Sequence, residues 1–219
     1  MNNKKIIAFD IETIADRSVI PFLPEVKPNG KLKDPAKIEA DIADKKAKQL
    51  ADMGLSPLTN MICCLSWYDS EGKSGNIVLE SESPEHEKDC LLSIWEDLSG
   101  GNIFVTFNGR SFDLPTLRSH SLKHKIKIPV DIDAGRYNRG NHIDMRQILA
   151  GDDKFAPGKL DFFAQRFLGV GKTEGIAGKD IQDWWDVGLK EDIAAYCDND
   201  AKITYQLFNL ACDCGLITA

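Results

Sequence analysis

The chain has 219 residues, of which 42% are hydrophobic and 28% charged, a balance typical of one folded domain rather than of a disordered chain. Its formal net charge of −7 argues against a protein that holds nucleic acid by overall positive charge. No apolar run approaches the roughly 20 residues of a membrane span, and Asp10 and Glu12 interrupt the N-terminal apolar run, so no signal peptide is predicted. We expect a cytoplasmic protein with a single domain over 1–219 and no membrane association, and the sequence leaves its oligomeric state undetermined.

The charge is unevenly distributed along the chain. Between Arg110 and Arg146 there are eight basic residues and four aspartates, so this stretch carries +4 and the rest of the chain −11. A local basic face on an acidic body suits an enzyme that holds a chain of phosphates briefly. An ordinary solvated face explains the charge alone equally well.

The six cysteines do not form the pattern of a disulfide framework. Cys63 and Cys64 are adjacent, and Cys212 and Cys214 lie near the C-terminus. A Cys-x-Cys pair without a second pair at ligand spacing is weak support for zinc. We expect reduced thiols.

The first predicted strand, 4–9, is apolar and ends at the acidic pair Asp10 and Glu12. An insertion at about 20–60 follows it. Within the insertion, proline, asparagine and glycine predict a loop over 20–34, and a charged, weakly amphipathic helix follows over 35–53. The apolar residues expected on the inner face of this helix are Ile38, Ile42 and Leu50.

Strands and helices alternate along the rest of the chain. Apolar runs predict strands at about 61–68, 75–79, 102–107 and 142–144. Helical spacing of apolar residues predicts helices near 91–98, 112–123, 145–149, 159–168 and 190–211. The glycine-rich residues 169–188 are predicted to form a loop. This order indicates a mixed α/β layer domain.

Acidic residues mark three separate segments. Asp10 and Glu12 are two residues apart on a strand, so both carboxylates point to one face, where they repel each other unless a cation is bound. Asp113 follows a strand and an Asn-Gly turn, and by itself it is most simply explained as an acid at a helix N-terminus. Tyr196 and Asp200 are four residues apart on one helix face, and Tyr196 taken alone is typical of a half-buried core tyrosine.

Taken together and in order, FDIET, NGRSFD and YCDND resemble the three motifs of the DEDD superfamily of 3′-5′ exonucleases. The second motif has the form found in the proofreading domain of family B DNA polymerases. Tyr196, with alanine at position 195, matches the tyrosine version of the third motif (DEDDy) and excludes the histidine version. The resemblance spans 6–208 and implies a ribonuclease H-like mixed β-sheet flanked by helices. The absence of a polymerase domain makes the chain similar to stand-alone exonucleases of this kind.

The resemblance also implies a chemistry. Two divalent ions, Mg²⁺ or Mn²⁺, are expected on Asp10, Glu12, Asp113 and Asp200, with Tyr196 orienting the attacking water. The expected substrate is nucleic acid, with single-stranded DNA favoured by the form of the second motif, and the expected products are nucleoside monophosphates. An exoribonuclease of the same superfamily and a non-catalytic nucleic-acid-binding module remain alternatives. The presence of all four acids favours the enzyme.

Other residues are weaker candidates. Asn108 and Phe112, in the second motif, are candidates for substrate contacts. Trp184 and Trp185 suit stacking on bases or packing on the core equally well.

Two further patterns are not assigned to the site. A Gly-Lys-Thr sequence within 168–175 is not a phosphate-binding loop, because the position that requires the first glycine is Arg166. His142 and Asp144 lie on one face of a short strand; a contact with the site is one alternative for them, and a structural role is the one we predict.

Overall fold

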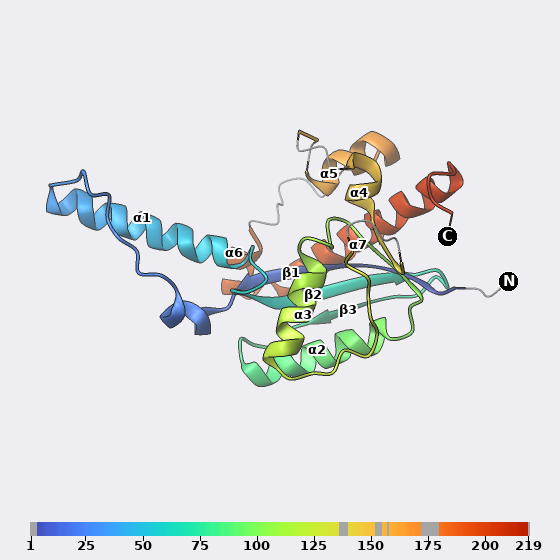
Figure 1. Ribbon diagram of the computed structural model, residues 1–219, viewed down its shortest axis with the longest axis horizontal. Helices are drawn as coiled ribbons and strands as arrows, with labels where there is room; N and C mark the ends of the chain where they lie inside the picture. The colour runs from blue at the N-terminus through green and yellow to red at the C-terminus, as the bar shows by residue number, and fades with distance from the viewer. Residues whose placement is uncertain (1–3, 136–139, 152–154, 157, 172–179, 219) are drawn as a thin grey trace.

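The computed structural model describes residues 4–135, 140–151, 155–156, 158–171 and 180–218. Within these residues one mixed sheet has the strand order β3-β2-β1-β4-β5 (Figure 1). Its strands are β1 (Ile6–Ala15), β2 (Asn60–Asp69), β3 (Ser74–Val78), β4 (Ile103–Thr106) and β5 (His142–Asp144). The central strand β1 pairs antiparallel with β2 and parallel with β4. The predicted mixed α/β architecture is confirmed.

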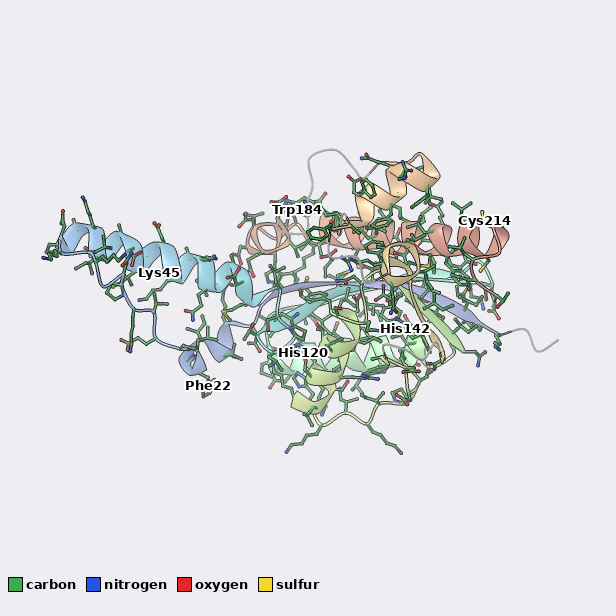
Figure 2. All side chains as sticks on the ribbon, turned by 45° about the horizontal axis from the view of Figure 1, so that its top comes forward. Phe22, Lys45, His120, His142, Trp184 and Cys214 are labelled. Carbon is green, nitrogen blue, oxygen red and sulfur yellow. The ribbon has the colours of Figure 1, made fainter. Side chains whose placement is uncertain are left out.

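Helices cover both faces of the sheet. The helical segments are η1 (Arg17–Phe22), α1 (Pro35–Met53), α2 (Pro84–Leu98), α3 (Asp113–Lys123), α4 (Met145–Ala150), α5 (Leu160–Phe163), the π-helical η2 (Ala164–Leu168), α6 (Ile181–Asp186) and α7 (Lys190–Asp213). Helix α7 lies on one face, and α2 and α3 lie on the other (Figures 1 and 2). In the described part of the chain, no helix combines the length and the apolar character needed to cross a membrane.

The first strand is longer than predicted. It continues to Ala15, so Asp10 and Glu12 lie inside β1 and not at its end. The strand continues because its apolar pattern does: Ile11, between the two acids, and Ile14, beyond them, are both buried. A shift in the pairing with β2 directly after Glu12 marks a β-bulge at this point. The two acids therefore lie in the part of β1 that pairs with β2, beyond its pairing with β4, which ends at Ala8.

The predicted helix at 35–53 is present as α1. Asp34 caps its N-terminus by accepting a hydrogen bond from the Ala36 N–H group, and Pro35 occupies the first turn, where its missing N–H group costs nothing. With η1 and the segment 23–34, this helix forms an arm that extends away from the sheet (Figure 1).

The expected inner face of α1 is partly wrong. Ile38 and Ile42 are half-buried, but Leu50 is 42% exposed, and Met53 is the buried residue of this helix. The helix projects from the domain, so it contacts little besides its own connecting segment. Only a narrow stripe of its surface can therefore be covered.

Residues 169–188 are not entirely loop, because helix α6 forms at Ile181–Asp186. Ile181 and Trp185, which are four residues apart, are both buried in the core. Their spacing is the helical signal that the glycine content of this region obscured. Residues 172–179, including most of the Gly-Lys-Thr pattern, lie outside the described residues.

The six cysteines are free thiols, as expected from the sequence. Cys63, Cys64, Cys90 and Cys197 are buried. Burial raises the pKa of Cys90 to about 12, because the thiolate loses its hydration in the core. These thiols therefore act as small apolar side chains.

A buried ionic cluster joins α2, α3 and the end of β1. The two carboxylate oxygens of Glu87 lie 2.5 Å from Nδ1 of His120 and 2.6 Å from Nε2 of His124. Nζ of Lys123 lies 2.7 Å from Glu87 Oε2 and 2.7 Å from Asp16 Oδ2. Figure 2 places His120 on the α3 side of the sheet, opposite Trp184. The cluster thus fixes the residue that follows β1 to both helices.

Electrostatics make Glu87 the centre of this cluster. Burial alone would raise the pKa of Glu87, but hydrogen bonds and charge from His120, together with hydrogen bonds from Lys123 and His124, outweigh it and lower the pKa to about 2. The folded-state pKa is thus below the ordinary value of 4.5. The stabilisation is therefore complete above that ordinary value, and it is lost as the pH falls toward about 2.

We predict that Glu87→Gln lowers the free energy of unfolding at pH 7 by roughly 3 kcal/mol, because the neutral glutamine cannot replace the carboxylate that Lys123, His120 and His124 contact. The difference from wild type should shrink between pH 4.5 and pH 3, because Glu87 of the unfolded chain takes up a proton in this range while Glu87 of the folded protein stays ionised. Urea unfolding at pH 7 and pH 3 measures both effects. Glu85→Gln, on the exposed side of the same helix, is the control and should change stability by only a few tenths of a kcal/mol. An equal loss at both pH values would contradict the ionic explanation.

Candidate active site

Three carboxylates meet between the sheet and α7. Asp10 and Glu12 come from β1, and Asp200 comes from α7. One oxygen atom from each lies within 4.8 Å of the others. Asp10 and Glu12 are half-buried, whereas Asp200 is only 6% exposed. The fold therefore places three like charges together at the edge of its core.

The close approach of α7 to β1 produces this cluster. Asp10 and Glu12 point to the same face because strand residues two apart do so. On that face, the Cys197 thiol donates a hydrogen bond to the Asp10 carbonyl oxygen at 3.3 Å. Cys197 and Ala201 are fully buried and small, so the helix can lie close to the strand. Asp200, beside Ala201, is thereby brought to the strand acids.

The donor set fits a divalent cation. Carboxylate oxygens are hard ligands, which suit Mg²⁺ or Mn²⁺ better than the softer metals that prefer thiolate or imidazole. Three carboxylates at this spacing repel one another in the absence of positive charge, and a bound cation removes that repulsion. The residues are thus arranged to hold a metal ion.

Asp113, the fourth predicted acid, lies outside the group of three. It begins α3 and is buried, and its Oδ1 atom has no hydrogen-bond partner among the described residues. Burial, with a smaller contribution from the charge of Asp144, raises the pKa of Asp113, while the N–H groups of Asp113 and Ile11 oppose the rise. Because Ile11 lies between the two strand acids, Asp113 is beside the same part of β1. A nearby cation would favour its ionised form.

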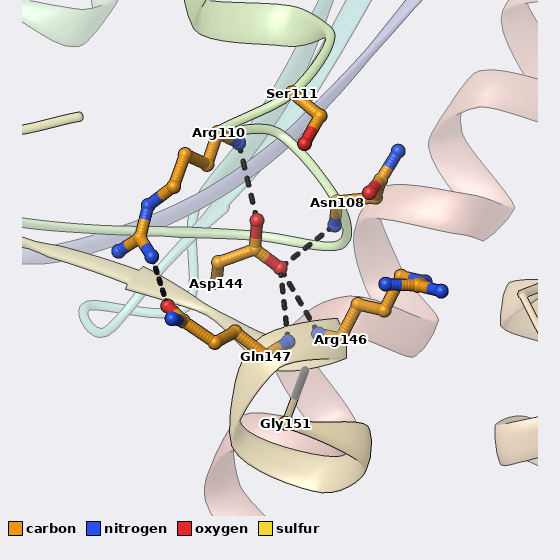
Figure 3. Close-up of a pocket in the computed structure, with 7 residues that line it drawn as sticks. All are labelled: Asn108, Arg110, Ser111, Asp144, Arg146, Gln147 and Gly151. Carbon is orange, nitrogen blue, oxygen red and sulfur yellow. Dashed lines mark hydrogen bonds between the residues drawn. The ribbon is translucent and has the colours of Figure 1, made fainter. Parts of the chain in front are cut away.

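The loop between β4 and Asp113 has a constrained backbone. Asn108 adopts the left-handed conformation, with φ of 67°, which asparagine tolerates better than most residues. A Cβ atom at Gly109 would collide with the side chain of Thr106, so glycine is required there. The Asp144 carboxylate accepts hydrogen bonds from the N–H groups of Asn108 at 2.9 Å and Arg110 at 3.1 Å (Figure 3). Asp144 therefore holds this loop in place.

His142 and Asp144 have the structural role predicted for them. Asp144 also accepts hydrogen bonds from the N–H groups of Arg146 and Gln147, which caps the N-terminus of α4. Burial lowers the pKa of His142 to about 4, so the ring is neutral at pH 7, and its Nε2 lies 2.9 Å from Thr106 Oγ1. Both side chains support the strand ends beside the site.

Tyr196 lies one turn before Asp200 on α7 and is 8% exposed. The Trp184 ring meets it edge-on, with ring centroids 6.3 Å apart and planes at 89°. Trp185 is buried, and its Nε1 donates to Glu82 Oε1 at 2.8 Å. The two tryptophans thus differ: Trp185 packs in the core, and Trp184 positions the tyrosine. The contact with Trp184 was missed because its segment was expected to be loop.

The two weaker candidates face different surroundings. Phe112 is half-buried and packs against the hydrophobic core, directly before Asp113. Asn108 instead lines a pocket of about 290 Å³. The other residues that line this pocket are Arg110, Ser111, Asp144, Arg146, Gln147 and Gly151 (Figure 3).

The basic stretch from 110 to 146 does not form a single surface. Lys123 belongs to the buried ionic cluster around Glu87. Arg110 and Arg146 line the pocket beside Asn108. Arg136 and Arg139 lie outside the described residues. Of the described basic residues in this stretch, Arg110 and Arg146 thus line the pocket, while Lys125 and Lys127 are exposed away from it.

Comparison with known proteins gives the family. Residues 58–214 match a family described as a predicted 3′-5′ exonuclease related to the exonuclease domain of PolB. The match covers well over half of the chain. The chain belongs to this family. Asp10, Glu12 and the arm precede the matched region.

Relatives of this exonuclease-family chain include an uncharacterized protein of Methanocaldococcus jannaschii (MJ0365), which is 29% identical over 185 residues, covering 78% of this chain and 98% of the relative. DNA polymerase 1 of Saccharolobus solfataricus is 30% identical over 150 residues, covering 61% of this chain and 16% of the polymerase. A DNA polymerase of Pyrococcus glycovorans is 28% identical over 120 residues, covering 48% of this chain and 15% of the polymerase. The chain thus matches about a sixth of the length of these polymerases.

A solved structure confirms the fold. The family B DNA polymerase from the hyperthermophilic archaeon Pyrobaculum calidifontis superposes with a TM-score of 0.64 at 16% identity, covering 95% of this chain and 24% of the polymerase. At this identity the likeness concerns the fold alone. The mixed sheet flanked by helices is the predicted ribonuclease H-like α/β fold.

We predict that Mn²⁺ or Mg²⁺ raises the melting temperature, because the ions bind the assembled carboxylates and not the unfolded chain. An ion at 100 times its Kd contributes about 2.7 kcal/mol, or roughly 5–10 °C for a domain of this size. In Asp10→Asn the ion-dependent rise should largely disappear. Its melting temperature in EDTA should equal or exceed that of wild type, because one of three repelling charges is gone.

Thermal unfolding in EDTA and in a Mn²⁺ titration measures both effects. Asp192→Asn, an exposed acid in the first turn of α7, is the matched control and should keep the wild-type response. A clearly lower melting temperature of Asp10→Asn in EDTA would contradict a repelling cluster.

Proposed function

We propose that this chain is a two-metal-dependent 3′-5′ exonuclease of the tyrosine branch (DEDDy). Its proposed substrate is DNA, preferentially single-stranded, and its products are nucleoside monophosphates. The observation that carries the proposal is the group of three carboxylate oxygens within 4.8 Å, formed by Asp10, Glu12 and Asp200. Membership of a family of predicted exonucleases supports the same activity.

The proposed metal ligands are Asp10, Glu12, Asp113 and Asp200. Divalent ions bound there would stabilise the attacking and leaving oxygens of a phosphodiester. The three clustered acids suit one ion. A second ion depends on Asp113, whose buried Oδ1 atom has no hydrogen-bond partner among the described residues.

Tyr196 is proposed to orient the attacking water through its hydroxyl group. It lies on the same helix face as Asp200, one turn away, so its hydroxyl group and the carboxylate serve one site. The edge of Trp184 restricts the tyrosine ring, which reduces the freedom that must be lost when the water is held. Asn108 and Phe112 are proposed to contact the substrate near its 3′ end.

We propose a single exonuclease domain over 1–219, in which residues at about 20–60 are an insertion. All five proposed catalytic residues lie on β1, at the start of α3 or on α7, and none lies in the arm. We therefore propose that the chain digests its substrate without a polymerase domain.

A single-stranded DNA labelled at its 5′ end should shorten stepwise to a ladder, and only when Mg²⁺ or Mn²⁺ is present. A 3′-phosphate should slow the reaction, and a closed single-stranded circle should resist it, because cleavage begins at a 3′ end. Gel analysis of timed samples, with Asp200→Ala as the inactive control, measures these outcomes. Cleavage of the circle or activity in excess EDTA would contradict the proposal.

A matched RNA oligomer decides the sugar preference in the same assay. Faster digestion of RNA would favour the exoribonuclease alternative. Binding of either oligomer without cleavage would favour a non-catalytic module.

Tyr196→Phe should lower kcat by about 10–10³-fold and leave substrate binding nearly unchanged, because the hydroxyl group acts chiefly in the transition state. The phenyl ring keeps the contact with Trp184, so the fold should be preserved. Asp200→Ala should reduce the rate further, because it removes a proposed metal ligand. Single-turnover rates at saturating Mn²⁺ measure the loss. A wild-type rate in Tyr196→Phe would remove this residue from the mechanism.

A further inference from the structure

A polar pocket lies beside the loop that leads from β4 to Asp113. It has a volume of about 290 Å³, and its lining includes two guanidinium groups, the Ser111 hydroxyl group and the Asn108 amide (Figure 3). This is a concentration of hydrogen-bond donors and positive charge in a chain of net charge −7. Such a lining suits an anion.

The one acid of the pocket is already engaged. Asp144 is buried, and its two carboxylate oxygens accept hydrogen bonds from four backbone N–H groups, those of Asn108, Arg110, Arg146 and Gln147. Its hydrogen bonds go to the backbone of the pocket wall, and they hold the loop and the first turn of α4 in place. Within the described part of the chain, Asp144 forms no ion pair with Arg146.

The two arginines of the pocket differ in whether the protein itself engages their guanidinium groups. A guanidinium nitrogen of Arg110 donates to Gln147 Oε1. The half-buried guanidinium group of Arg146 forms no hydrogen bond or ion pair within the described part of the chain. Figure 3 shows the Arg146 and Asn108 side chains next to each other, away from the Arg110–Gln147 pair. Arg146 is therefore the cation of this pocket that is available to a ligand.

The sheet register places the pocket near the carboxylates. Ala8 of β1 is opposite Val105 of β4, and Thr106 of β4 is opposite Asp144 of β5. Two strand spacings therefore separate Asp144 from β1, roughly 10 Å. The loop from Asn108 to Asp113 spans this distance, with the pocket at its first residue and the buried acid at its last. A nucleic-acid strand whose end lies at the carboxylates can reach Arg146 within a few nucleotides.

We propose that this pocket binds a backbone phosphate of the substrate strand on the 5′ side of the scissile bond, with Arg146 as the cation and Asn108 and Ser111 as additional donors. This inference rests on the proposed exonuclease function. The contact positions the strand and carries no sequence information, because it is made to the phosphate. It is made equally before and during cleavage, so it contributes to substrate binding and not to the chemical step.

Arg146→Gln should raise the KM for a single-stranded oligomer about tenfold and leave kcat nearly unchanged. The slope of log Kd against log salt, measured by fluorescence anisotropy in EDTA, should fall by about 0.7, the value for one phosphate contact on a single strand. Arg146→Lys should lose less affinity, because it keeps the charge. Lys88→Gln removes an equal charge from the exposed side of α2 and is the matched control.

A phosphate scan locates the contact. Oligomers that each carry one neutral methylphosphonate, at successive positions from the 3′ end, are compared for binding to wild type and to Arg146→Gln. We expect one position where neutralisation weakens wild-type binding about tenfold and has little effect on the variant. Equal sensitivity of both proteins at every position would overturn the inference, and so would equal effects of Arg146→Gln and Lys88→Gln.

The two proposals fail differently. An active wild-type enzyme with no special effect at Arg146 overturns only the phosphate pocket. A wild-type protein that neither binds nor cleaves single strands overturns the proposed function and the pocket together. The circular-dichroism spectrum and the melting temperature of Arg146→Gln confirm that the variant is folded. If it is not, Arg146→Lys replaces it in the scan and is expected to show a reduced position-specific effect.

Discussion

The contact between α7 and β1 is the constraint on which the rest of the site depends. Small buried residues, Cys197 and Ala201, let the helix lie close to the strand, and this approach brings Asp200 to Asp10 and Glu12. Mutual repulsion of the three carboxylates opposes the contact. The apolar face of α7, buried along most of a 24-residue helix, offsets that repulsion. The stability of the core thus holds the acids in an arrangement that they would not adopt by themselves.

Asp144, at the end of β5, fixes the backbone next to the site as the contact between α7 and β1 fixes the carboxylates. One buried carboxylate satisfies four N–H groups, and it thereby fixes the loop after β4 and begins α4. The same loop presents Asn108 to the pocket at one end and Asp113 to β1 at the other. The proposed chemistry and the proposed phosphate contact are therefore built on one rigid segment, which keeps their separation constant.

The arm is attached to the domain where the site is assembled. Arg17, just after β1, is 2.6 Å from Asp186 of α6 and 3.0 Å from Glu82. The Ala15 N–H group also donates to Gln182 of α6 at 2.8 Å. Helix α6 also carries Trp184, which contacts Tyr196. The same helix therefore contacts both the base of the arm and the tyrosine. Ala15 and Arg17 precede the region that matches the exonuclease family, whereas α6 lies within it.

The sequence by itself determined the alternation of strands and helices, the bounds of α1, the reduced cysteines and the shared face of Asp10 and Glu12. These features depend on local periodicity, capping and composition, which neighbouring residues specify. The resemblance of three short motifs then predicted the fold family and the candidate acids. Only the tertiary structure decided that β1 continues past its acids, that α6 forms beside Tyr196 and that Lys123 pairs with the buried Glu87. It also brought Arg146 and Asn108 to the same pocket, although they are 38 positions apart in the sequence. In the sequence analysis, Asn108 belonged to the second motif and Arg146 only to the count of basic residues. Contacts of this kind depend on strand order and register, and the packing of distant segments fixes both.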